Sequence, residues 1–426
     1  MPYSVFPTGT TIYYPEKCYN SLILYDGRNG RSFLIDMGGN LVHSWPYTGF
    51  PVEMIDPKIN NGLRGHILCQ KESEVYSCET LLIVDWDANI VWEWGKKAPG
   101  GAARQNHDLA PLPNGNILLV AFLLSSIPEV SDKPVNDQIF YEVTRDGEIV
   151  WKWISSEHID EFGFTDKKKA LLFSDKMRPR SSIFVINDMA PLGSNKWFNS
   201  GDERFHPDNI MIDSREGSFI AIIEKKTGKI VWQMGPDYPG SYDHSKRSFT
   251  GSLPRPVDAI SGQHDAHMIP EGVPGAGNVL VFDNQGAAGF PPIYLNMFPG
   301  SRVLEIDPIT KEIVWQYDAS SGGLPFWNFF SSFISSARRL PNGNTLICEG
   351  MHGRIFQVTP NGEIVWEYVN PYFGQFADHD VESGGSRSNY VFRAQPIPYD
   401  WIPEQISHSQ KPVIPPDLTD FHIHTG

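Results

Sequence analysis

The most regular feature of the sequence is a short apolar segment that recurs six times. Within each copy, large apolar residues alternate with other residues at a period of two, which is typical of a β-strand with one buried face. Most copies carry a tryptophan at the third position, where successive copies are 49, 59, 81, 83 and 51 residues apart. These Ile-Val-Trp segments are Leu41–Trp45, Ile90–Trp94, Ile149–Trp153, Ile230–Met234, Ile313–Tyr317 and Ile364–Tyr368.

A turn and another apolar strand precede each of these segments. The turns are rich in Asp, Asn and Gly, as in RDGE at 145–148 and PNGE at 360–363, and such residues close β-hairpins. A second hairpin is marked by Leu112–Asn116 and Leu340–Asn344, with a weaker counterpart from His264 to Asn278. The repeated unit therefore has about four strands, as in a propeller blade.

Six such units predict an all-β fold, a six-bladed β-propeller with inserted loops, in which residues 1–426 form a single domain. We expect the inserted loops near residues 165–205, 236–262 and 285–300, with a short helix beginning near Ser156. We also expect each Ile-Val-Trp segment on an inner or middle strand of its blade. A β-sandwich or two smaller barrels are the alternatives, but neither explains six copies of one hairpin.

Charge and apolar content exclude several classes of partner. The formal net charge is −15, from 35 Lys and Arg against 50 Asp and Glu, and an acidic protein repels the phosphates of nucleic acids. The longest apolar run, Ile117–Leu124, is too short to span a membrane. No signal peptide is visible, so we expect a cytoplasmic protein as the sequence is written, or a periplasmic one if a leader was removed.

The four cysteines, Cys18, Cys69, Cys78 and Cys348, form no CxxC pair. Without such spacing the sequence gives no sign of a zinc site, and we expect neither a metal nor a cofactor. Cys69 and Cys78 flank a link between two strands, so they either form a disulfide or remain free, buried thiols.

Two histidines occupy the same position of the repeat. His107 and His264 each lie six residues before the proline of a second hairpin, Pro113 or Pro270. Because a propeller gathers equivalent positions of its blades at one mouth of the central channel, we expect the two histidines to converge there as catalytic residues. A neutral imidazole can act as a nucleophile or as a general base. The neighbouring aspartates could instead only orient groups within the blades.

Polar residues near these positions suit an anionic substrate. An arginine offers a fixed fork of donors for a sulfate, phosphate or carboxylate, and asparagine, serine and histidine add further hydrogen bonds. We expect Arg104, Asn187, His267 and Ser336 to contribute to the substrate-binding side of the same cavity.

Four longer motifs surround these residues, namely APGGAARQNHD at 98–108, DERFHPDNIMIDSR at 202–215, GQHDAHMIPEGVPGAGNVLVFDN at 262–284 and LPNGNTLICEG at 340–350. With them, most of the chain resembles the bacterial arylsulfotransferase family, whose members are six-bladed propellers. The resemblance implies that a sulfuryl group passes from an aryl sulfate to a phenol through a sulfohistidine. It implies that His264 is the nucleophile, that His107 is a base or sulfate ligand, and that Arg215 and Asn187 bind the sulfuryl group.

The chain departs from this family pattern at one position. The family has a third histidine two residues before the asparagine, where this chain has Val185. That histidine would supply hydrogen bonds or positive charge to the sulfuryl oxygens, and His206 is a candidate to replace it in space. Two other functions therefore stay open. One is a lyase that acts on a uronate-containing saccharide, whose carboxylate Arg215 or Arg104 would neutralise, and the other is a non-catalytic propeller that binds a partner protein.

Overall fold

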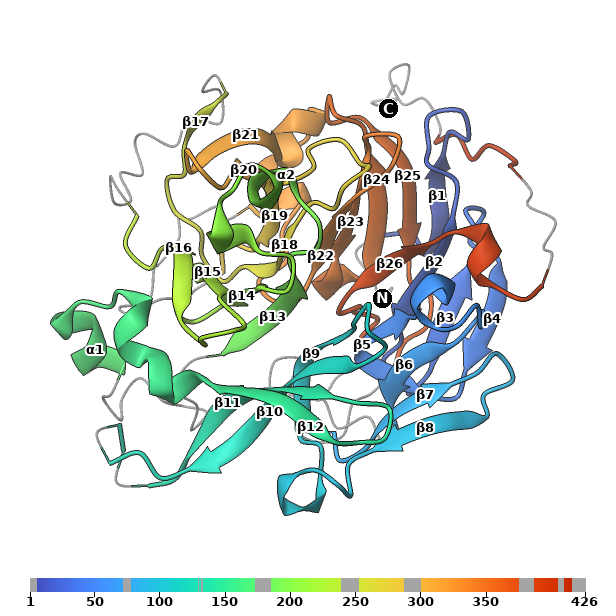
Figure 1. Cartoon of the computed structure of the whole chain (residues 1–426). Coiled ribbons are helices and arrows are strands. Elements are labelled where there is room, and N and C mark those ends of the chain that lie inside the picture. Colours follow the sequence, from blue (N-terminus) through green and yellow to red (C-terminus); the bar gives the residue numbers. More distant parts are fainter. Residues whose placement is uncertain are drawn as a thin grey trace.

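The computed structural model describes residues 6–71, 78–128, 130, 131, 133–172, 185–238, 253–286, 300–374, 387–404 and 410–415. Within this part of the chain the strands form six antiparallel sheets of four or five strands each (Figure 1). The prediction of an all-β, six-bladed β-propeller is therefore confirmed.

Each of the first three blades has four strands. From the channel outwards, the first blade contains β26 (Ala394–Ile397), β2 (Leu22–Asp26), β3 (Ser32–Ile35) and β4 (Leu41–Trp45). The second contains β5 (Thr48–Met54), β6 (Ile67–Gln70), β7 (Leu81–Val84) and β8 (Ile90–Trp94). The third contains β9 (Gln105–Pro111), β10 (Ile117–Ser125), β11 (Val135–Val143) and β12 (Ile149–Ile154).

The last three blades follow the same plan, and two of them gain a fifth strand at the outer edge. The fourth blade contains β13 (Ile186–Pro191), β14 (Ile210–Ser214), β15 (Phe219–Ile223) and β16 (Ile230–Met234). The fifth contains β18 (His264–Met268), β19 (Val279–Asp283), β20 (Arg302–Asp307), β21 (Glu312–Tyr317) and β17 (Arg255–Pro256). The sixth contains β22 (Ser336–Arg339), β23 (Thr345–Glu349), β24 (Arg354–Val358), β25 (Ile364–Val369) and β1 (Gly9–Tyr13).

Segments from the two ends of the sequence close the ring. The late strand β26 pairs with β2, with Leu22 opposite Ile397, and the early strand β1 pairs with β25, with Gly9 opposite Val369. Figure 1 shows the orange-red β26 beside the blue β2, and the blue β1 beside β25. The innermost strands β26, β5, β9, β13, β18 and β22 also contact one another in a closed circle.

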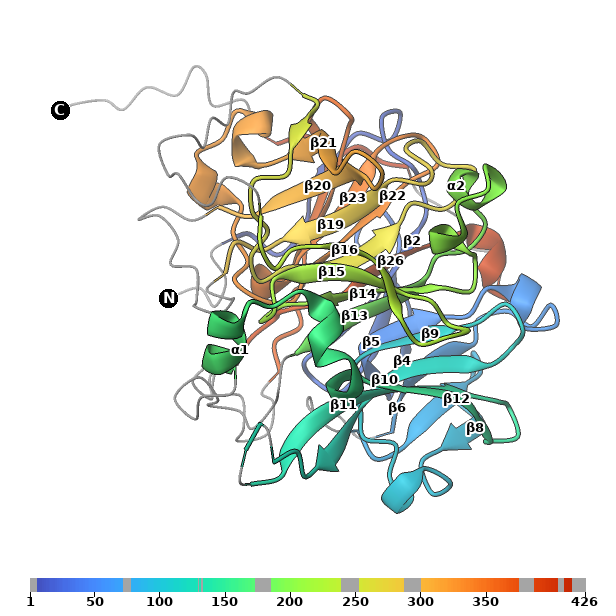
Figure 2. The ribbon, with the colours of Figure 1, turned by 60° about the vertical axis from the view of Figure 1, so that its left-hand side comes forward.

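Short helices occupy the longer connections. After β12, a 3-10 helix (Ser155–Phe162) and α1 (Asp166–Leu172) form at the position expected for a helix, and Figure 2 shows α1 at the periphery of the molecule. The remaining parts of the expected loops at 173–184, 239–252 and 287–299 lie outside the described residues. The other helices are α2 (Lys196–Asn199) and the 3-10 helices Pro57–Ile59, Pro99–Gly101, Glu203–Phe205, Ala319–Gly322, Phe326–Asn328, Gly350–His352 and Tyr399–Trp401.

The apolar core lies between neighbouring sheets. Leu118 and Phe140 of the third blade, for example, pack with Ile212 and Phe219 of the fourth. The strands β2, β14 and β19 are buried along their whole length because each has a further sheet on both faces. All four cysteines are free thiols, so Cys69 and Cys78 do not form a disulfide in this structure.

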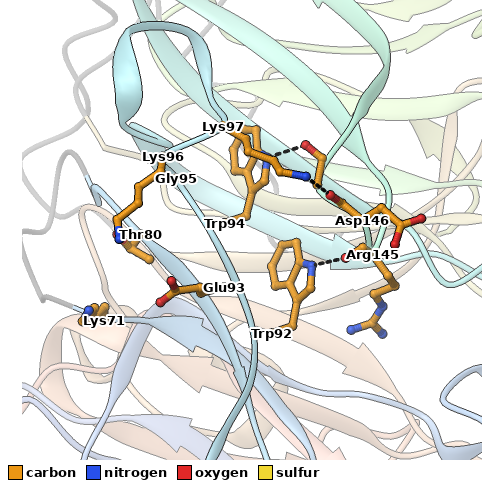
Figure 3. Close-up of a pocket in the computed structure, with 11 residues that line it drawn as sticks. Lys71, Thr80, Trp92, Glu93, Trp94, Gly95, Lys96, Lys97, Arg145 and Asp146 are labelled. Carbon is orange, nitrogen blue, oxygen red and sulfur yellow. Dashed lines mark hydrogen bonds between the residues drawn. The ribbon is translucent and has the colours of Figure 1, made fainter.

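The Ile-Val-Trp segments lie on the fourth strand of each blade, so the expected inner or middle position is wrong for the first four blades, where this strand is the outermost, while β17 and β1 cover it in the last two. The alternating pattern reflects an outer strand, in which Ile90 and Val91 are 44% and 51% exposed while Trp94 is buried. The indole N–H of Trp94 donates to the carbonyl of Gly147 at 3.1 Å, in a turn of the next blade. Figure 3 shows Trp92 and Trp94 directed toward this turn, at Arg145 and Asp146.

Every blade makes such a tryptophan bond to the next one. The indole groups donate to backbone carbonyls in the hairpin turns that precede the neighbouring fourth strand, and the last bond returns from the sixth blade to the first. The remaining pairs are Trp45 with Asp85, Trp153 with Gly228, Trp232 with Pro308, Trp315 with Pro360 and Trp366 with Met37, at 2.7 to 3.0 Å. The recurring tryptophan thus links blades rather than strands within one blade.

Charged side chains from all six blades meet in the central channel. Arg393, which precedes β26, places its Nη1 2.9 Å from Oδ1 of Asp108 and 3.2 Å from Oε1 of Glu53. Its Nη2 lies 2.5 Å from Oδ1 of Asp188. Arg338 on β22 binds Asp265 on β18 at 2.5 Å. We call Glu53, Asp108, Asp188, Asp265, Arg338 and Arg393 the central ion cluster.

Burial and mutual repulsion shape the protonation of this cluster. Burial, opposed by Arg393 and aided by the charges of Asp108 and Asp265, raises the pKa of Asp188 to about 7. Burial alone would lower the pKa of Arg393, but the surrounding carboxylates hold it well above its usual range. Arg393 therefore stays charged, and it is the main cation that compensates the buried carboxylates.

Replacing this cation is expected to destabilise the whole ring. In Arg393→Met, Asp108 and Asp188 stay buried without their partner, which costs about 3–5 kcal/mol when one side of a buried ion pair is removed. Urea unfolding at pH 8 measures this loss in the free energy of unfolding. The control Arg204→Met removes an exposed pair with Asp202, worth less than about 1 kcal/mol. Equal, small losses in both variants would contradict the role of Arg393.

Candidate active site

The candidate site is built around His264, the first residue of β18. The side-chain amide of Gln263 donates to the carbonyls of Ser214 and Phe219, both at 2.9 Å, and holds the start of β18 against the fourth blade. The next residue, Asp265, has a φ of 63°, and the pairing of β18 with β19 is irregular from His264 to His267. Such an irregularity re-aims side chains, so a simple period of two does not describe this strand.

Four groups from three blades hold the His264 ring. On one side, Nδ1 lies 2.8 Å from Oδ1 of Asn284 and 3.1 Å from the carbonyl of Gly262. On the other side, the backbone N–H of Ile334 donates to Nε2 at 3.1 Å, and Nδ2 of Asn187 lies 2.8 Å from the same atom. A backbone N–H can donate a hydrogen bond but cannot accept one. Nε2 must therefore be the acceptor and carry the lone pair, and the ring hydrogen is on Nδ1.

The surroundings keep this imidazole neutral. The side chain of His264 is buried, and burial together with the nearby positive charge of Arg215 lowers its pKa to about 3. Hydrogen bonds to Asn284 and Gly262 oppose the shift but do not offset it. At neutral pH, His264 therefore has an unprotonated Nε2, which is the form of histidine that acts as a nucleophile.

Arg215 and Asn187 act on this histidine from the fourth blade, Asn187 through a hydrogen bond and Arg215 through its charge. Arg215 follows β14, and its backbone N–H donates to the carbonyl of Val185 at 3.1 Å, beside the start of β13. Its side chain is 19% exposed. Within the described residues, the buried Nε of Arg215 and the buried Oδ1 of Asn187 have no hydrogen-bond partner. Because an unpaired buried polar atom costs about 1–3 kcal/mol, the two atoms favour a polar ligand beside His264.

His107 approaches the same region from the third blade. It adopts a φ of 60° within β9, is half-buried, and places Nδ1 close to Oδ1 of Asn106. The rings of His107 and His264 both contact Phe392, each with ring centroids 6.5 Å apart. Phe50 packs against Phe392 with centroids 4.0 Å apart and the two rings tilted by 37°. An aromatic surface therefore lies between the two histidines.

The other predicted substrate-binding residues have different surroundings. His267 binds Arg338 through its Nδ1 at 2.8 Å, so it borders the central ion cluster, and burial lowers its pKa to about 4. The hydroxyl of Ser336 accepts the backbone N–H of Ala394 at 3.4 Å. Arg104 directly precedes β9 of the third blade and has a φ of 51°. Its charge opposes the rise that burial causes in the pKa of Tyr141. None of the hydrogen bonds described here joins these three residues to His264.

Comparison with known proteins identifies the family of this chain. The family model described as Arylsulfotransferase (ASST) matches residues 15–377, which is most of the chain and includes His107, Asn187, Arg215 and His264. The chain belongs to the arylsulfotransferase family. Membership supports an arylsulfotransferase-like enzyme, and it confirms the resemblance seen in the sequence motifs.

No curated protein sequence matches this arylsulfotransferase family member. Among solved structures, a protein of unknown function from Bacteroides caccae is 13% identical, with 89% of this chain and 99% of that one covered and a TM-score of 0.48. Virginiamycin B lyase from Staphylococcus aureus is 11% identical, with 85% and 84% covered and a TM-score of 0.39. The Dos1 propeller is 9% identical, with 86% and 73% covered and a TM-score of 0.38. Similarity at this level says nothing about activity.

The position that departs from the family pattern has an apolar environment. Val185 is buried, and its carbonyl accepts the N–H of Arg215 beside the start of β13. His206 does not take its place, because it lies in the connection between β13 and β14 at the opposite ends of these strands. There its Nδ1 accepts the N–H of Asp208 at 3.2 Å. His206 therefore does not supply the histidine that the family pattern has at the position of Val185.

The sequence did not point to three of the four groups that hold His264, namely Asn284, the N–H of Ile334 and the carbonyl of Gly262. Asn284 ends the motif at 262–284, directly after β19, and Ile334 lies two residues before β22. The position of Asn284 after a buried strand, in the same blade as His264, was a usable signal. Nothing in the sequence marks the contact through the backbone N–H of Ile334.

Other potential sites in the described part of the chain are few. No group of three or more His, Cys, Asp or Glu side chains there could hold a metal ion, and no helix there is long and apolar enough to cross a membrane. A cavity of about 250 Å³ lies on the outer side of the second and third blades (Figure 3). Lys96, Lys97 and Arg145 help to line it, but none of the predicted site residues does.

Proposed function

We propose that this protein transfers a sulfuryl group from an aryl sulfate to a phenolic acceptor through a sulfohistidine formed at Nε2 of His264. The observation that carries the proposal is a buried, neutral histidine whose Nε2 bears the lone pair, in a member of the arylsulfotransferase family. A family match alone does not define the reaction, whereas a nucleophile of this kind is suited to attack at sulfur.

The proposed first step forms one bond and breaks another. The lone pair of Nε2 attacks the sulfur of the aryl sulfate, the sulfur–oxygen bond to the aryl group breaks, and the phenolate leaves with the electron pair. In the second step, the oxygen of an acceptor phenol attacks the sulfur of the sulfohistidine. The acceptor loses its hydroxyl proton to a base, the nitrogen–sulfur bond breaks, and Nε2 recovers its lone pair.

Several groups around Nε2 suit the charge on the transferred sulfuryl oxygens. Asn187 Nδ2 and the N–H of Ile334 already point at Nε2, so small movements bring them to oxygens bound to an attacked sulfur. Arg215 adds a positive charge and a buried N–H donor without a partner among the described residues. Preorganised donors of this kind stabilise charge that develops in a transition state.

His107 and the aromatic residues complete the proposed assignment. His107 is our candidate for the base that takes the acceptor proton, because its ring and that of His264 contact the same side chain, Phe392. Phe50 and Phe392 offer a buried aromatic surface next to both histidines. Aromatic rings pack well on one another, so this surface suits the aryl group of a donor or acceptor.

The covalent step can be tested with donor alone. When the protein is mixed with 4-nitrophenyl sulfate and quenched, we expect intact mass spectrometry to show one added sulfuryl group on the wild type. His264→Ala should not gain this mass, because it lacks the attacking nitrogen. His206→Ala is the matched control and should gain it as the wild type does. A wild type that releases nitrophenol but never gains the mass, even at short times, would rule out the sulfohistidine.

The proposed role of Arg215 predicts a large loss of rate. In Arg215→Ala, we expect kcat/KM for 4-nitrophenyl sulfate to fall by on the order of 10²–10³, the scale of removing one preorganised donor from a transition state. The control Arg204→Ala, on the surface and paired with Asp202, should stay close to the wild type. Similar rates for both variants in steady-state assays would contradict a role of Arg215 in sulfuryl transfer.

The lowered pKa of His264 predicts the pH dependence of the first step. Because the folded protein holds this pKa at about 3, Nε2 stays unprotonated from pH 8 down to pH 5, and protonation removes the nucleophile only at lower pH. The pre-steady-state burst of nitrophenol should therefore have a rate constant that is independent of pH between 5 and 8. A fall in that rate constant with a midpoint near pH 6.5, the ordinary value for histidine, would contradict the assignment.

A further inference from the structure

We propose that Asn284 is a positioning residue that fixes the tautomer of His264, so that Nδ1 carries the proton and Nε2 is left with the lone pair. The role rests on the proposed function of His264 and extends it to a residue outside the predicted site. Asn284 touches no substrate in this account and acts only through the histidine.

The orientation of the Asn284 amide is determined by two carbonyl groups. Nδ2 of Asn284 donates to the carbonyl of Ser331 at 2.7 Å and to that of Ile334 at 2.9 Å. Because a carbonyl oxygen only accepts hydrogen bonds, the amide nitrogen must face these two groups. The amide oxygen is then left to face Nδ1 of His264, 2.8 Å away, and Nδ1 must be the donor.

The opposite side of the ring independently indicates the same tautomer. The backbone N–H of Ile334 donates to Nε2 of His264 at 3.1 Å, and a backbone N–H cannot accept. Ile334 has a φ of 51°, which is unfavourable for a β-branched residue and which orients this N–H. Ile334 thus donates to His264 through its N–H and accepts from Asn284 through its carbonyl. Through these two hydrogen bonds, the backbone of Ile334 links the Asn284 amide to the His264 imidazole.

The neutral charge of Asn284 matters as much as its geometry. Two charged side chains act on His264, namely the partly buried Arg215, which lowers the pKa of the imidazole, and the buried Asp265, which raises it. A carboxylate in place of the Asn284 amide would stabilise the imidazolium form and reduce the fraction of free nucleophile. An amide accepts the Nδ1 hydrogen without adding a charge, so it selects the tautomer while the histidine stays neutral.

The tautomer can be observed without any catalytic assay. Long-range ¹H–¹⁵N NMR spectra of the full-length protein labelled with ¹⁵N-histidine distinguish protonated from unprotonated ring nitrogens, and the His264 signals are those missing in His264→Gln. At pH 7 we expect a protonated Nδ1 and an unprotonated Nε2 in the wild type. A protonated Nε2 would overturn the proposal.

Two substitutions at Asn284 separate tautomer from charge. Asn284→Leu removes the shorter of the two acceptors at Nδ1 and leaves only the Gly262 carbonyl, 3.1 Å away, so we expect a weaker preference between the tautomers, a mixed tautomer signal and a kcat lower by on the order of 10- to 100-fold with little change in KM. Asn284→Asp keeps an acceptor but adds a charge, so the protonated Nδ1 should persist while the pKa of His264 rises by about 1–3. The acid limb of the first step should then move toward neutral pH.

A matched control distinguishes positioning from packing. Asn344 is also buried and donates through Nδ2 to a carbonyl, that of Lys17 at 2.8 Å, at the far end of β22 and β23. Asn344→Leu should leave the His264 spectrum and the pH profile unchanged. Unchanged His264 spectra in both Asn284 variants would overturn the proposal. If Asn284→Leu does not fold, the test rests on the tautomer in the wild-type spectrum and on the rise of the His264 pKa in Asn284→Asp. The expected tautomer in a protein that forms no sulfuryl adduct would support the positioning role and reject the proposed function.

Discussion

The neutralisation of buried carboxylates in the channel is the constraint on which the rest of this propeller depends. Glu53, Asp108, Asp188 and Asp265 come from four different blades, and the arginines that compensate them come from the remaining two. A buried ion pair contributes little net stability, but an unpaired charge in the same place is very costly. The cluster therefore permits few arrangements of the six inner strands other than the one observed.

The same carboxylates also bind the backbone of the following blade. Asp108 accepts the N–H of Met189 at 2.9 Å, Asp188 accepts that of Asp265 at 2.6 Å, and Asp265 accepts that of Ala337 at 3.0 Å. These bonds fix the register of β9, β13, β18 and β22 relative to one another. His264 immediately precedes Asp265, so its ring meets groups from the fourth and sixth blades only when this register is correct. The ion cluster thus positions the strands that carry the groups around His264.

The sequence predicted the parts of this structure that repeat. Six Ile-Val-Trp segments implied six blades, and the shared position of His107 and His264 in the repeat pointed to the residues whose rings both contact Phe392. Their place on the fourth strand was not predicted, because alternation identifies a strand with one buried face but not its rank in the sheet. The tryptophan partners lie in the next blade, 40 to 76 residues away for five of the pairs and 329 residues away for Trp366, and no local pattern shows that.

Features specific to single blades were harder to predict. The left-handed backbone at Asp265 separates the surroundings of His264 and His267, although the two histidines are three residues apart. Asn284 reaches His264 from the next strand of the same blade, far along the sequence. Ile334 reaches it from the segment before the sixth blade, through a backbone N–H in a conformation that its side chain disfavours. At Val185 the sequence alone showed the loss of a family histidine, and the structure shows that His206 does not replace it.

The most direct test of the central claim is a crystal structure of the protein frozen after soaking with 4-nitrophenyl sulfate in the absence of acceptor. The account predicts continuous density from Nε2 of His264 to a sulfuryl group, with Arg215 and Asn187 in contact with its oxygens. An unmodified His264, with sulfate or intact donor bound elsewhere, such as in the cavity beside Lys96, Lys97 and Arg145, would contradict it.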